Sequence, residues 1–457
     1  MEKYEVVVIG GGPAGITLAK MLGSKRRTAV VRPEDYSMIY CAMPYAVEGL
    51  LSVQKTLKKD ELVTDAGAEL IRSMARGIDF DRKTVNLADS TVIAYDKLVL
   101  ATGANPFLPP IDGIDLNGVM GFKTEKDMKR IIQFIDSGVT RAVVIGAGAI
   151  GVELAQALKK RELDVDIIDM AASALPNMID PEIAKEIEKE LILRGINLHL
   201  NAKVTALRGT DYVQQIVLDN GEVIDFDELD KCSIAGDDEL AGIVVFAAGM
   251  RPEVSLVKDS GMEIGRDGII VNDRMETNIP DVYAVGDCVQ FTNGITGKVF
   301  SGKLATNAVP MARVLGFNLL GQDRRYPGFY NGSATKVGKY YVGGTGLSES
   351  AAKIAGFDTV CAYSQVTSKF AIMPDAKVIR LKLIADNKTA NLIGAQVLSE
   401  EPVTDRIDLL TFAIQNESGM ADLARLSYAA QPYQSCFPAA NLIVLAAEDI
   451  LAKLQTA

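Results

Sequence analysis

Two glycine-rich turns, which open at Gly10 and Gly146, constrain the fold of this 457-residue chain more than any other feature of its sequence. The first follows the apolar run 4–9 and precedes the helical pattern ITLAKMLGS. The second follows the apolar run 142–145 and precedes VELAQALKK. Each pattern predicts a strand, a tight turn and a helix. A further apolar run follows each helix, at 28–31 and at 165–168. The chain is therefore predicted to contain two parallel βαβ units.

The spacing of the glycines within each turn is typical of a dinucleotide site. The first glycine permits the tight turn, the second lets the backbone approach a pyrophosphate, and the third lets the helix pack close to the strand. The phosphates then lie at a helix N-terminus, where free N–H groups and the helix dipole favour negative charge. The first site is expected at Gly10, Gly12, Pro13, Ala14 and Gly15, and the second at Gly146, Gly148, Ala149, Ile150 and Gly151.

The residue that ends the second strand of such a unit usually accepts hydrogen bonds from ribose hydroxyls. In the second unit this residue is Asp169, whose carboxylate would repel a 2′-phosphate, and no arginine follows it in MAAS. We therefore predict NADH rather than NADPH. In the first unit the matching residue is Arg32, which departs from the pattern. Either Glu34 supplies the ribose contact instead, or Arg32 lies against the adenine.

Charge and composition exclude several other functions. The formal charge is -11, which argues against a nucleic-acid partner because no basic excess neutralises phosphates. No apolar stretch is long enough for a membrane span, and MEKYEVVVIGGG leaves no room for a signal peptide, so a cytoplasmic location is expected. The single histidine, His199, excludes Ser-His-Asp hydrolases and histidine-rich zinc sites. The odd, scattered cysteines predict neither a disulfide framework nor a metal site.

The chain changes character after about residue 328. GKYYVGGTGLS, KVIRLKLIAD and NLIGAQVLS alternate like antiparallel strands, and two helical patterns follow them. This part is predicted to be a separate α+β domain. The acidic segment 208–241 lacks such periodicity and is interpreted as an irregular surface excursion.

The order of the motifs resembles the flavoprotein pyridine nucleotide-disulfide oxidoreductases over essentially the whole chain. It runs GGGPAG, ATG, GAGAIG, AAG with Pro252, and TNIPDVYAVGD. The resemblance implies an α/β fold with two Rossmann-like domains and a C-terminal α+β dimerisation domain. Residues 1–113 and 247–327 would bind FAD, 114–246 would bind NAD, and 328–457 would form a homodimer. It also implies that Asp287 hydrogen-bonds the flavin ribitol. Further cofactor contacts are expected at Ala101, Thr102, Gly103, Ala248, Gly249 and Gly286.

The segment SMIYCAMPYAVEGLL carries Cys41 alone, where two-cysteine members of the family carry a CxxxxC pair. It resembles the single-cysteine branch, which comprises coenzyme A disulfide reductases, persulfide reductases, and NADH oxidases and peroxidases. A helix start near Cys41 would lower the pKa of its thiol. A single redox cysteine needs an external sulfur partner. Cys41 is therefore expected to attack a small disulfide or persulfide, and reduced flavin would then split the mixed disulfide.

Other positions bear on the acceptor. Pro13 and Ala14 stand where oxidases and peroxidases of the branch usually carry a histidine, which favours sulfur chemistry. The family's catalytic His–Glu pair is absent. LSYAAQPYQSCFP replaces it and offers Tyr428 and Tyr433 as proton donors across the dimer. The sequence departs from the coenzyme A pattern at Tyr40, in the stretch 368–374 and at the extra Cys436. Cys436 is expected to lie either over the active site of the partner subunit or in a core with Phe437, Leu442 and Ile443.

The sequence is compatible with more than one substrate and more than one reaction. Bound coenzyme A would need basic groups for its phosphates, and the nearest cluster by family position is Lys20, Lys25, Arg26 and Arg27, which is equally well explained as a solvated helix end. The leading hypothesis is FAD-dependent, NADH-driven reduction of a coenzyme A-type disulfide or persulfide. An NADH oxidase, a reductase of a small electron-transfer protein and a non-catalytic redox sensor are the rivals.

Overall fold

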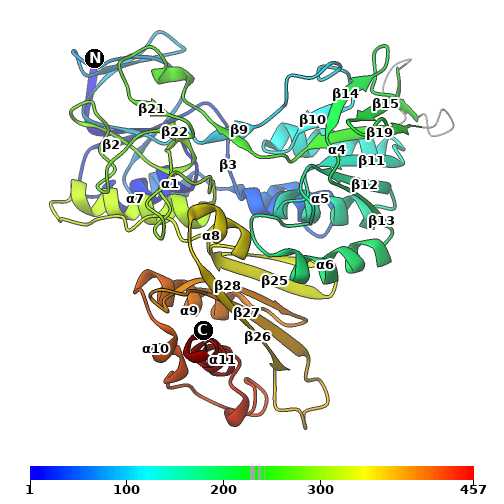
Figure 1. The fold of residues 1–457 in the computed structure, drawn as a ribbon. Coiled ribbons are helices and arrows are strands. Elements are labelled where there is room, and N and C mark those ends of the chain that lie inside the picture. Colours follow the sequence, from blue (N-terminus) through cyan, green and yellow to red (C-terminus); the bar gives the residue numbers. More distant parts are fainter. Residues whose placement is uncertain (227–231, 235–237, 241, 457) are drawn as a thin grey trace.

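The computed structural model describes residues 1–226, 232–234, 238–240 and 242–456, which form three units, each built on its own large sheet (Figure 1). The first sheet has the order β5-β2-β1-β8-β7-β6, with β23 beside β8. Its parallel part pairs β1 with β2 and β8 and aligns Ile9 with Leu100. Val6, Val7 and Val8 of β1 are all buried, as expected for a parallel strand covered on both faces. The elements are β1 (Glu2–Ile9), β2 (Thr28–Arg32), β5 (Glu69–Arg72), β6 (Ala75–Asp79), β7 (Thr84–Leu87), β8 (Val92–Leu100), β23 (Val282–Ala284), α1 (Pro13–Leu22) and α7 (Ala305–Leu319).

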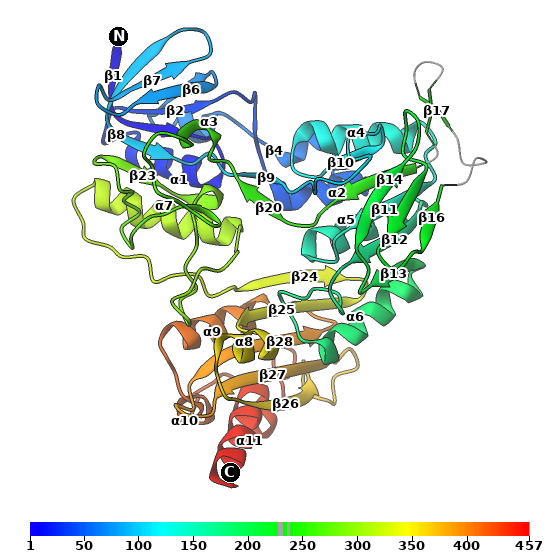
Figure 2. The ribbon, with the colours of Figure 1, turned by 45° about the horizontal axis from the view of Figure 1, so that its top comes forward.

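The second sheet is entirely parallel and has the order β10-β19-β11-β12-β13. It contains the second glycine turn, between β11 and α5. The chain passes between the first two units along the antiparallel pair β9 (Ala104–Pro106) and β20 (Met250–Pro252) (Figure 2). The elements of this unit are β10 (Val119–Gly121), β11 (Arg141–Ile145), β12 (Asp164–Asp169), β13 (Ile196–Leu200), β19 (Gly242–Phe246), α4 (Glu125–Asp136), α5 (Ala149–Lys160) and α6 (Pro181–Leu193).

The interpretation of segment 208–241 as irregular is wrong for its first part. β14 (Val204–Arg208), β15 (Gln215–Leu218) and β16 (Val223–Asp225) form an antiparallel sheet. Ile216, Leu218, Ile224 and Phe226 are buried in one cluster with Val143 and Val244 of the second sheet. These strands are only three to five residues long, so their apolar alternation was hard to recognise. Residues 227–231, 235–237 and 241 lie outside the described residues. Between them, the structure describes two short antiparallel strands, β17 (Cys232–Ile234) and β18 (Asp238–Leu240).

The C-terminal unit confirms the predicted α+β character. Its antiparallel sheet has the order β24-β25-β28-β27-β26, and the apolar sides of α9 and α11 are buried against it. The elements are β24 (Ser333–Val337), β25 (Tyr340–Gly346), β26 (Thr359–Thr367), β27 (Val378–Asp386), β28 (Leu392–Ser399), α8 (Glu349–Ala355), α9 (Thr404–Gln415), α10 (Met420–Ala424) and α11 (Leu442–Thr456). None of the described helices is long and apolar enough to span a bilayer.

Candidate functional site

The first glycine turn joins β1 to α1. Its first and last glycines, Gly10 and Gly15, are closely packed, whereas the space beside Gly12 is open. Gly10 has φ +119°, and a Cβ there would lie 2.0 Å from the carbonyl oxygen of Ala101. A Cβ on Gly15 would lie 2.0 Å from the carbonyl oxygen of Gly10. A Cβ on Gly12, in contrast, would meet no described atom within 4 Å. Gly12 caps α1 without a side-chain hydrogen bond, and Pro13 and Ala14 begin the helix. The turn therefore offers free backbone N–H groups beside open space, as a pyrophosphate requires.

The second turn repeats this arrangement between β11 and α5. Gly146 has φ +118° and lies against Ala247, and a Cβ on Gly151 would lie 1.9 Å from the carbonyl oxygen of Gly146. The position of Gly148 is open among the described atoms. Ala149 and Ile150 begin α5, and the Ile150 side chain is exposed beside the turn. Each of the two turns therefore fits a dinucleotide.

Asp169 is the last residue of β12, as predicted, and its carboxylate faces the second glycine turn. One carboxylate oxygen, Oδ2, accepts a hydrogen bond from the backbone N–H of Ala147 at 2.6 Å. The other, Oδ1, accepts one from the N–H of Ala171 at 2.7 Å. The negative charge is thus fixed at the edge of the turn where a nucleotide ribose would lie.

Arg32, the last residue of β2, is 2% exposed and lies across the first glycine turn. A Cβ on Gly11 would lie 2.4 Å from Arg32 Cδ, so Gly11 leaves room for the arginine side chain. The guanidinium pairs with Asp60 and donates to the backbone oxygen of Asp35 at 3.1 Å. Its Nε is buried and has no hydrogen-bond partner within the described part of the chain.

Asp60 was not singled out from the sequence, because 28 residues separate it from Arg32 and only the fold brings the two together. It lies just before α3 (Glu61–Thr64) and also pairs with Arg72, whose Nη1 lies 3.2 Å from Asp35. Glu34 is exposed. A carboxylate therefore lies near the end of β2 in Asp60, whose oxygens pair with Arg32 and Arg72, whereas Glu34 is turned to solvent.

The remaining residues expected around the first nucleotide gather behind its turn. The backbone N–H of Ala101 donates to Ile9, and Thr102 Oγ1 donates to the backbone oxygen of Glu253 at 2.6 Å. Gly103 and Gly249 have positive φ and open Cβ positions, and Ala248 precedes Gly249. Gly286 has φ +78° and presents Asp287, whose Oδ1 is buried with no partner among the described residues. Unpaired buried polar atoms and open glycine positions are what a bound FAD would satisfy and fill, so these residues fit the cofactor.

Cys41 is exposed and lies in a single 3₁₀ turn, Tyr40–Ala42, directly before α2 (Met43–Val47). The strand β3 (Ser37–Met38) leads into it and pairs with β4 (Leu57–Lys58). Met43, Ala46 and Val47 are buried in the core of the second unit, and α2 packs against α4 and α5. Lys160 and Arg161, at the end of α5, bind Glu48 and the backbone oxygen of Val47. The thiol therefore lies where the first unit meets the second.

The helix after Cys41 is only five residues long, so its dipole contributes less to the thiol than the sequence suggested. Two ionisable side chains respond to a charge on Cys41. Burial lowers the pKa of Lys58, and the negative charge of Cys41 partly opposes this. Burial also raises the pKa of Tyr45, with smaller contributions from Glu153 and Cys41. Lys58, on β4, and Tyr45, on α2, therefore interact electrostatically with the thiol.

Two further polar residues at this junction were missed. Glu153 of α5 accepts a hydrogen bond from Thr335 Oγ1 at 2.6 Å, and burial raises the pKa of its carboxyl group. Lys123, between β10 and α4, lies 3.7 Å from Asp287 Oδ2 and 4.2 Å from the centre of the Tyr40 ring. A signal for Glu153 was its place on the helix that follows the second glycine turn. Lys123 belongs to no recognisable motif.

Tyr428 and Tyr433 lie between α10 and α11, at the end of the molecule remote from α2 (Figure 2). Both are exposed, and the Tyr428 hydroxyl donates to the backbone oxygen of Pro438 at 2.7 Å. Phe437 is exposed too, so its expected place in the core is wrong, whereas Leu442 and Ile443 are buried. The Phe437 ring packs against Phe370 of the stretch 368–374, with 5.3 Å between ring centres. Within one chain, these tyrosines are not brought to Cys41.

The basic residues considered for coenzyme A phosphates are partly committed elsewhere. Arg26 pairs with Glu5 at 2.9 Å, and Arg27 pairs with Glu2 and lies over the Tyr4 ring. Lys25 is exposed. Lys20 is exposed in the last turn of α1 and interacts electrostatically with Lys58.

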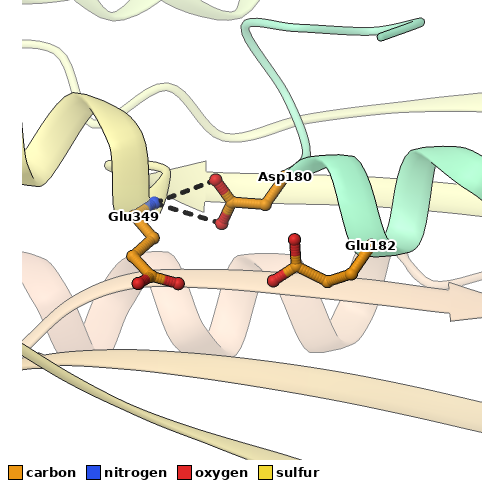
Figure 3. Close-up of side chains that lie close together, drawn as sticks. All are labelled: Asp180, Glu182 and Glu349. Atoms are coloured by element: carbon orange, nitrogen blue, oxygen red, sulfur yellow. Dashed lines mark hydrogen bonds between the residues drawn. The ribbon is translucent and has the colours of Figure 1, made fainter.

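Asp180, Glu182 and Glu349 form an acidic cluster between α6 and α8, shown in Figure 3. The ammonium of Lys382 on β27 lies among them, fully buried, and its Nζ is 2.9 Å from Asp180 and 2.8 Å from Glu349 and also pairs with Glu182. Gln396 donates a further hydrogen bond to Asp180 at 2.6 Å. Because one lysine pairs with all three carboxylates, the cluster is an ion-pair network that joins the second unit to the C-terminal unit.

His199 is likewise structural. It lies on β13, and its Nε2 is 2.9 Å from Asp166 Oδ1. The hydrogen bond to Asp166 raises the pKa of His199.

Comparison with known proteins agrees with this geometry. Residues 4–312 match the pyridine nucleotide-disulphide oxidoreductase family, and residues 333–438 match the dimerisation domain of the same family. A protein of Methanocaldococcus jannaschii named NADH oxidase is 32% identical over 98% of this chain and 99% of its own. A Pyrococcus furiosus protein named NAD(P)H sulfur oxidoreductase (CoA-dependent) is 32% identical over 89% of this chain and 90% of its own. The solved structure of an NAD-dependent persulfide reductase from A. fulgidus is similar with a TM-score of 0.88 and 32% identity, over 99% of this chain and 83% of that one. The chain therefore belongs to the pyridine nucleotide-disulphide oxidoreductase family and is an NAD(P)H oxidoreductase.

Proposed function

We propose that the protein is an FAD-dependent NADH oxidoreductase that reduces a low-molecular-weight disulfide or persulfide of the coenzyme A type through Cys41. The observation that carries this proposal is the thiol of Cys41, the one exposed cysteine among those whose burial the structure describes, at the junction of two dinucleotide-type units. A second cysteine next to it would imply an internal disulfide. With Cys41 alone, the other sulfur must come from the substrate.

We assign the two nucleotides by the order of the motifs along the chain, and the open position in each glycine turn supports a nucleotide at both. FAD would be held by the first turn, by Ala101–Gly103 and by Asp287, with residues 1–113 and 247–327 as its domain. NADH would be held by the second turn and Asp169, with residues 114–246 as its domain. Bound FAD supplies the two-electron relay between NADH and sulfur.

The chemistry of the chain itself starts from the Cys41 thiolate. Its sulfur attacks one sulfur of the acceptor, a Cys41–S–S–R bond forms, and the acceptor's S–S bond breaks to release a thiolate or hydrosulfide. For a disulfide, the complete reaction is NADH + H⁺ + RSSR → NAD⁺ + 2 RSH. In its protonated form Lys58, which interacts electrostatically with Cys41, would stabilise the thiolate.

The acceptor would be recognised in a homodimer. The dimerisation-domain match supports a dimer formed through residues 328–457. Tyr428 and Tyr433, exposed in one chain, would then act as proton donors at the Cys41 of the other chain. Lys20 and Lys58 are the cations available near Cys41 for the phosphates of coenzyme A. The names of the Pyrococcus furiosus and A. fulgidus relatives favour this sulfur chemistry.

An NADH oxidase is the second candidate, because the M. jannaschii relative carries that name. Against it, Pro13 and Ala14 occupy the first glycine turn, and His199 is engaged with Asp166 in the second unit. A reaction with oxygen therefore has no histidine beside the first turn to handle protons.

The test compares acceptors in one assay. Purified holoenzyme is given NADH with coenzyme A disulfide, with coenzyme A persulfide, or with dissolved oxygen alone, while NADH and oxygen are both monitored. The proposal expects fast NADH oxidation only with a sulfur acceptor and no matching oxygen uptake. Equal NADH and oxygen consumption without any sulfur compound would establish the oxidase instead. The mass of the group bound to Cys41 after purification without reductant then identifies the thiol.

A further inference from the structure

Lys123 lies in the short connection between β10 and α4, outside every motif considered above. The connection is held rigidly. Its backbone N–H donates to Asp127 Oδ2 at 3.0 Å, and Thr124 and Asp127 form a capping box at the start of α4. Phe122, just before it, is buried in the core of the second unit. The direction of the Lys123 side chain is therefore fixed by the second unit, although its ammonium reaches the first.

The Lys123 side chain is 20% exposed, and its charged end has two neighbours. Nζ lies 3.7 Å from Asp287 Oδ2 and 4.2 Å from the centre of the Tyr40 ring. Asp287 Oδ1 remains buried without a partner among the described residues. The contact with Asp287 is longer than a hydrogen bond, so the ammonium is only loosely paired. Burial accordingly lowers the pKa of Lys123, and Asp287 opposes the change.

A partly buried cation that lacks a close partner costs free energy in the resting protein. Its two neighbours are informative: Tyr40 directly precedes Cys41, and Asp287 is the acid assigned to the flavin ribitol. Lys123 thus lies between the thiol segment and the flavin side of the proposed site. An aromatic face and a distant carboxylate hold the ammonium in place and leave it able to interact with further negative charge.

We propose that Lys123 is a positioning residue that stabilises the negative charge entering the redox centre from NADH. The inference rests on the proposed function. A hydride carries two electrons and one proton, so its transfer from NADH adds one negative charge to the centre. When the sulfur–sulfur bond on Cys41 is then broken, the proton would leave on the departing thiol RSH and the negative charge would remain at the centre as the Cys41 thiolate. A fixed cation in a poorly solvated site favours this reduced state over the oxidised one.

Because α2 is short, a nearby cation matters more for stabilising negative charge at Cys41. A helix of five residues provides a weak dipole at Cys41, and Lys58 lies on the side of β4. Lys123 approaches from the opposite unit, through Tyr40. Because its backbone belongs to the second unit, it would also make the charge of the redox centre depend on how the two units are packed together.

The experiment measures how far the flavin of the holoenzyme is reduced at set NADH/NAD⁺ ratios, by flavin absorbance without any acceptor. Lys123→Met should lower the equilibrium constant for reduction about tenfold. Lys123→Arg should restore most of it. Lys126→Met removes an exposed lysine three residues further on and should leave the constant unchanged. FAD content and melting temperature are measured for each variant, and any that loses FAD is reconstituted with excess FAD before titration.

The outcomes separate this inference from the proposed function. If the wild-type protein binds no FAD, or if NADH does not reduce its flavin, the proposed function fails. If the wild-type flavin is reduced and Lys123→Met gives the same equilibrium constant, the inference alone is overturned. An equal loss in Lys123→Arg would also overturn it, because a positive charge would then not be what matters.

Discussion

The carboxylate of Asp169 accepts a hydrogen bond from the backbone N–H of Ala147, with 2.6 Å between Oδ2 and the nitrogen. This bond ties the end of β12 to the second glycine turn. Because the N–H of Ala171 binds the other oxygen, neither oxygen can rotate away from the turn without losing a hydrogen bond. A negative charge fixed in this way would meet the adenosine ribose of the nicotinamide nucleotide.

NADH should accordingly be used at least about tenfold better than NADPH in kcat/KM, or about 1.4 kcal/mol. The reason is repulsion between Asp169 and the 2′-phosphate. Stopped-flow flavin reduction with each nucleotide measures the preference. Asp169→Asn should reduce the ratio of kcat/KM for NADH to that for NADPH, mainly by increasing kcat/KM for NADPH. Equal rates for both nucleotides in the wild-type protein would remove Asp169 from this role.

The first nucleotide site should depend on Arg32 and on the room that Gly11 leaves for it. Gly11→Ala would place a Cβ 2.4 Å from Arg32 Cδ and push the guanidinium away from Asp60. Arg32→Met would remove the guanidinium group that pairs with Asp60. Both changes should weaken FAD binding about tenfold in a fluorescence titration of the apoprotein. Glu34→Gln, at an exposed neighbour, is the control and should bind FAD normally. The opposite pattern, with Glu34→Gln weakened and Arg32→Met unaffected, would assign the ribose contact to Glu34.

The Lys382 network should stabilise the contact between the second and C-terminal units. Lys382→Met would remove the buried cation that the three carboxylates share, leaving Lys353 on Glu349 alone, and should cost about 3–5 kcal/mol of unfolding free energy. Hydrogen bonds from Lys353 and then Lys382 lower the pKa of Glu349 to about 2. A lowered pKa stabilises the fold above the unfolded value near 4.5, and this stability is lost as the pH falls towards 2.

Urea unfolding at several pH values checks this prediction. The difference between Lys382→Met and the wild type should be largest near neutral pH and should shrink in acid, as the three carboxylates become protonated. A difference that does not change with pH would mean that lost packing of the lysine chain, not its charge, is responsible.

Local sequence was sufficient wherever one short segment determines the conformation. Gly10 and Gly15 are required by contacts with the adjoining strand and helix, so the βαβ units could be predicted from spacing alone. Asp169 was found for the same reason, because it lies at a fixed distance along one strand. The C-terminal sheet was recognisable from its alternating residues.

What the sequence did not reveal depends on contacts between distant segments. Asp60 and Lys123 reach Arg32 and Asp287 only through the fold, and no local pattern marks either of them. The place of Tyr428 depends on a second copy of the chain. In the sequence, Glu34 looked as suitable as Arg32 for the nucleotide contact. Which residue near the end of β2 is buried and which is exposed depends on the neighbouring strand β5, which local sequence does not show.

The central claim is that Cys41 carries the electrons to sulfur, and the Cys41→Ser variant tests it most directly. Cys361→Ser is the matched control, since Cys361 lies on β26 of the C-terminal unit and burial raises the pKa of its thiol to about 12, which disfavours the thiolate. We predict that Cys41→Ser keeps FAD and is still reduced by NADH, yet retains at most about a few per cent of NADH-dependent disulfide and persulfide reduction. Cys361→Ser should match the wild type. If Cys41→Ser reduced these acceptors at the wild-type rate, the flavin would react with them directly and the account would be contradicted.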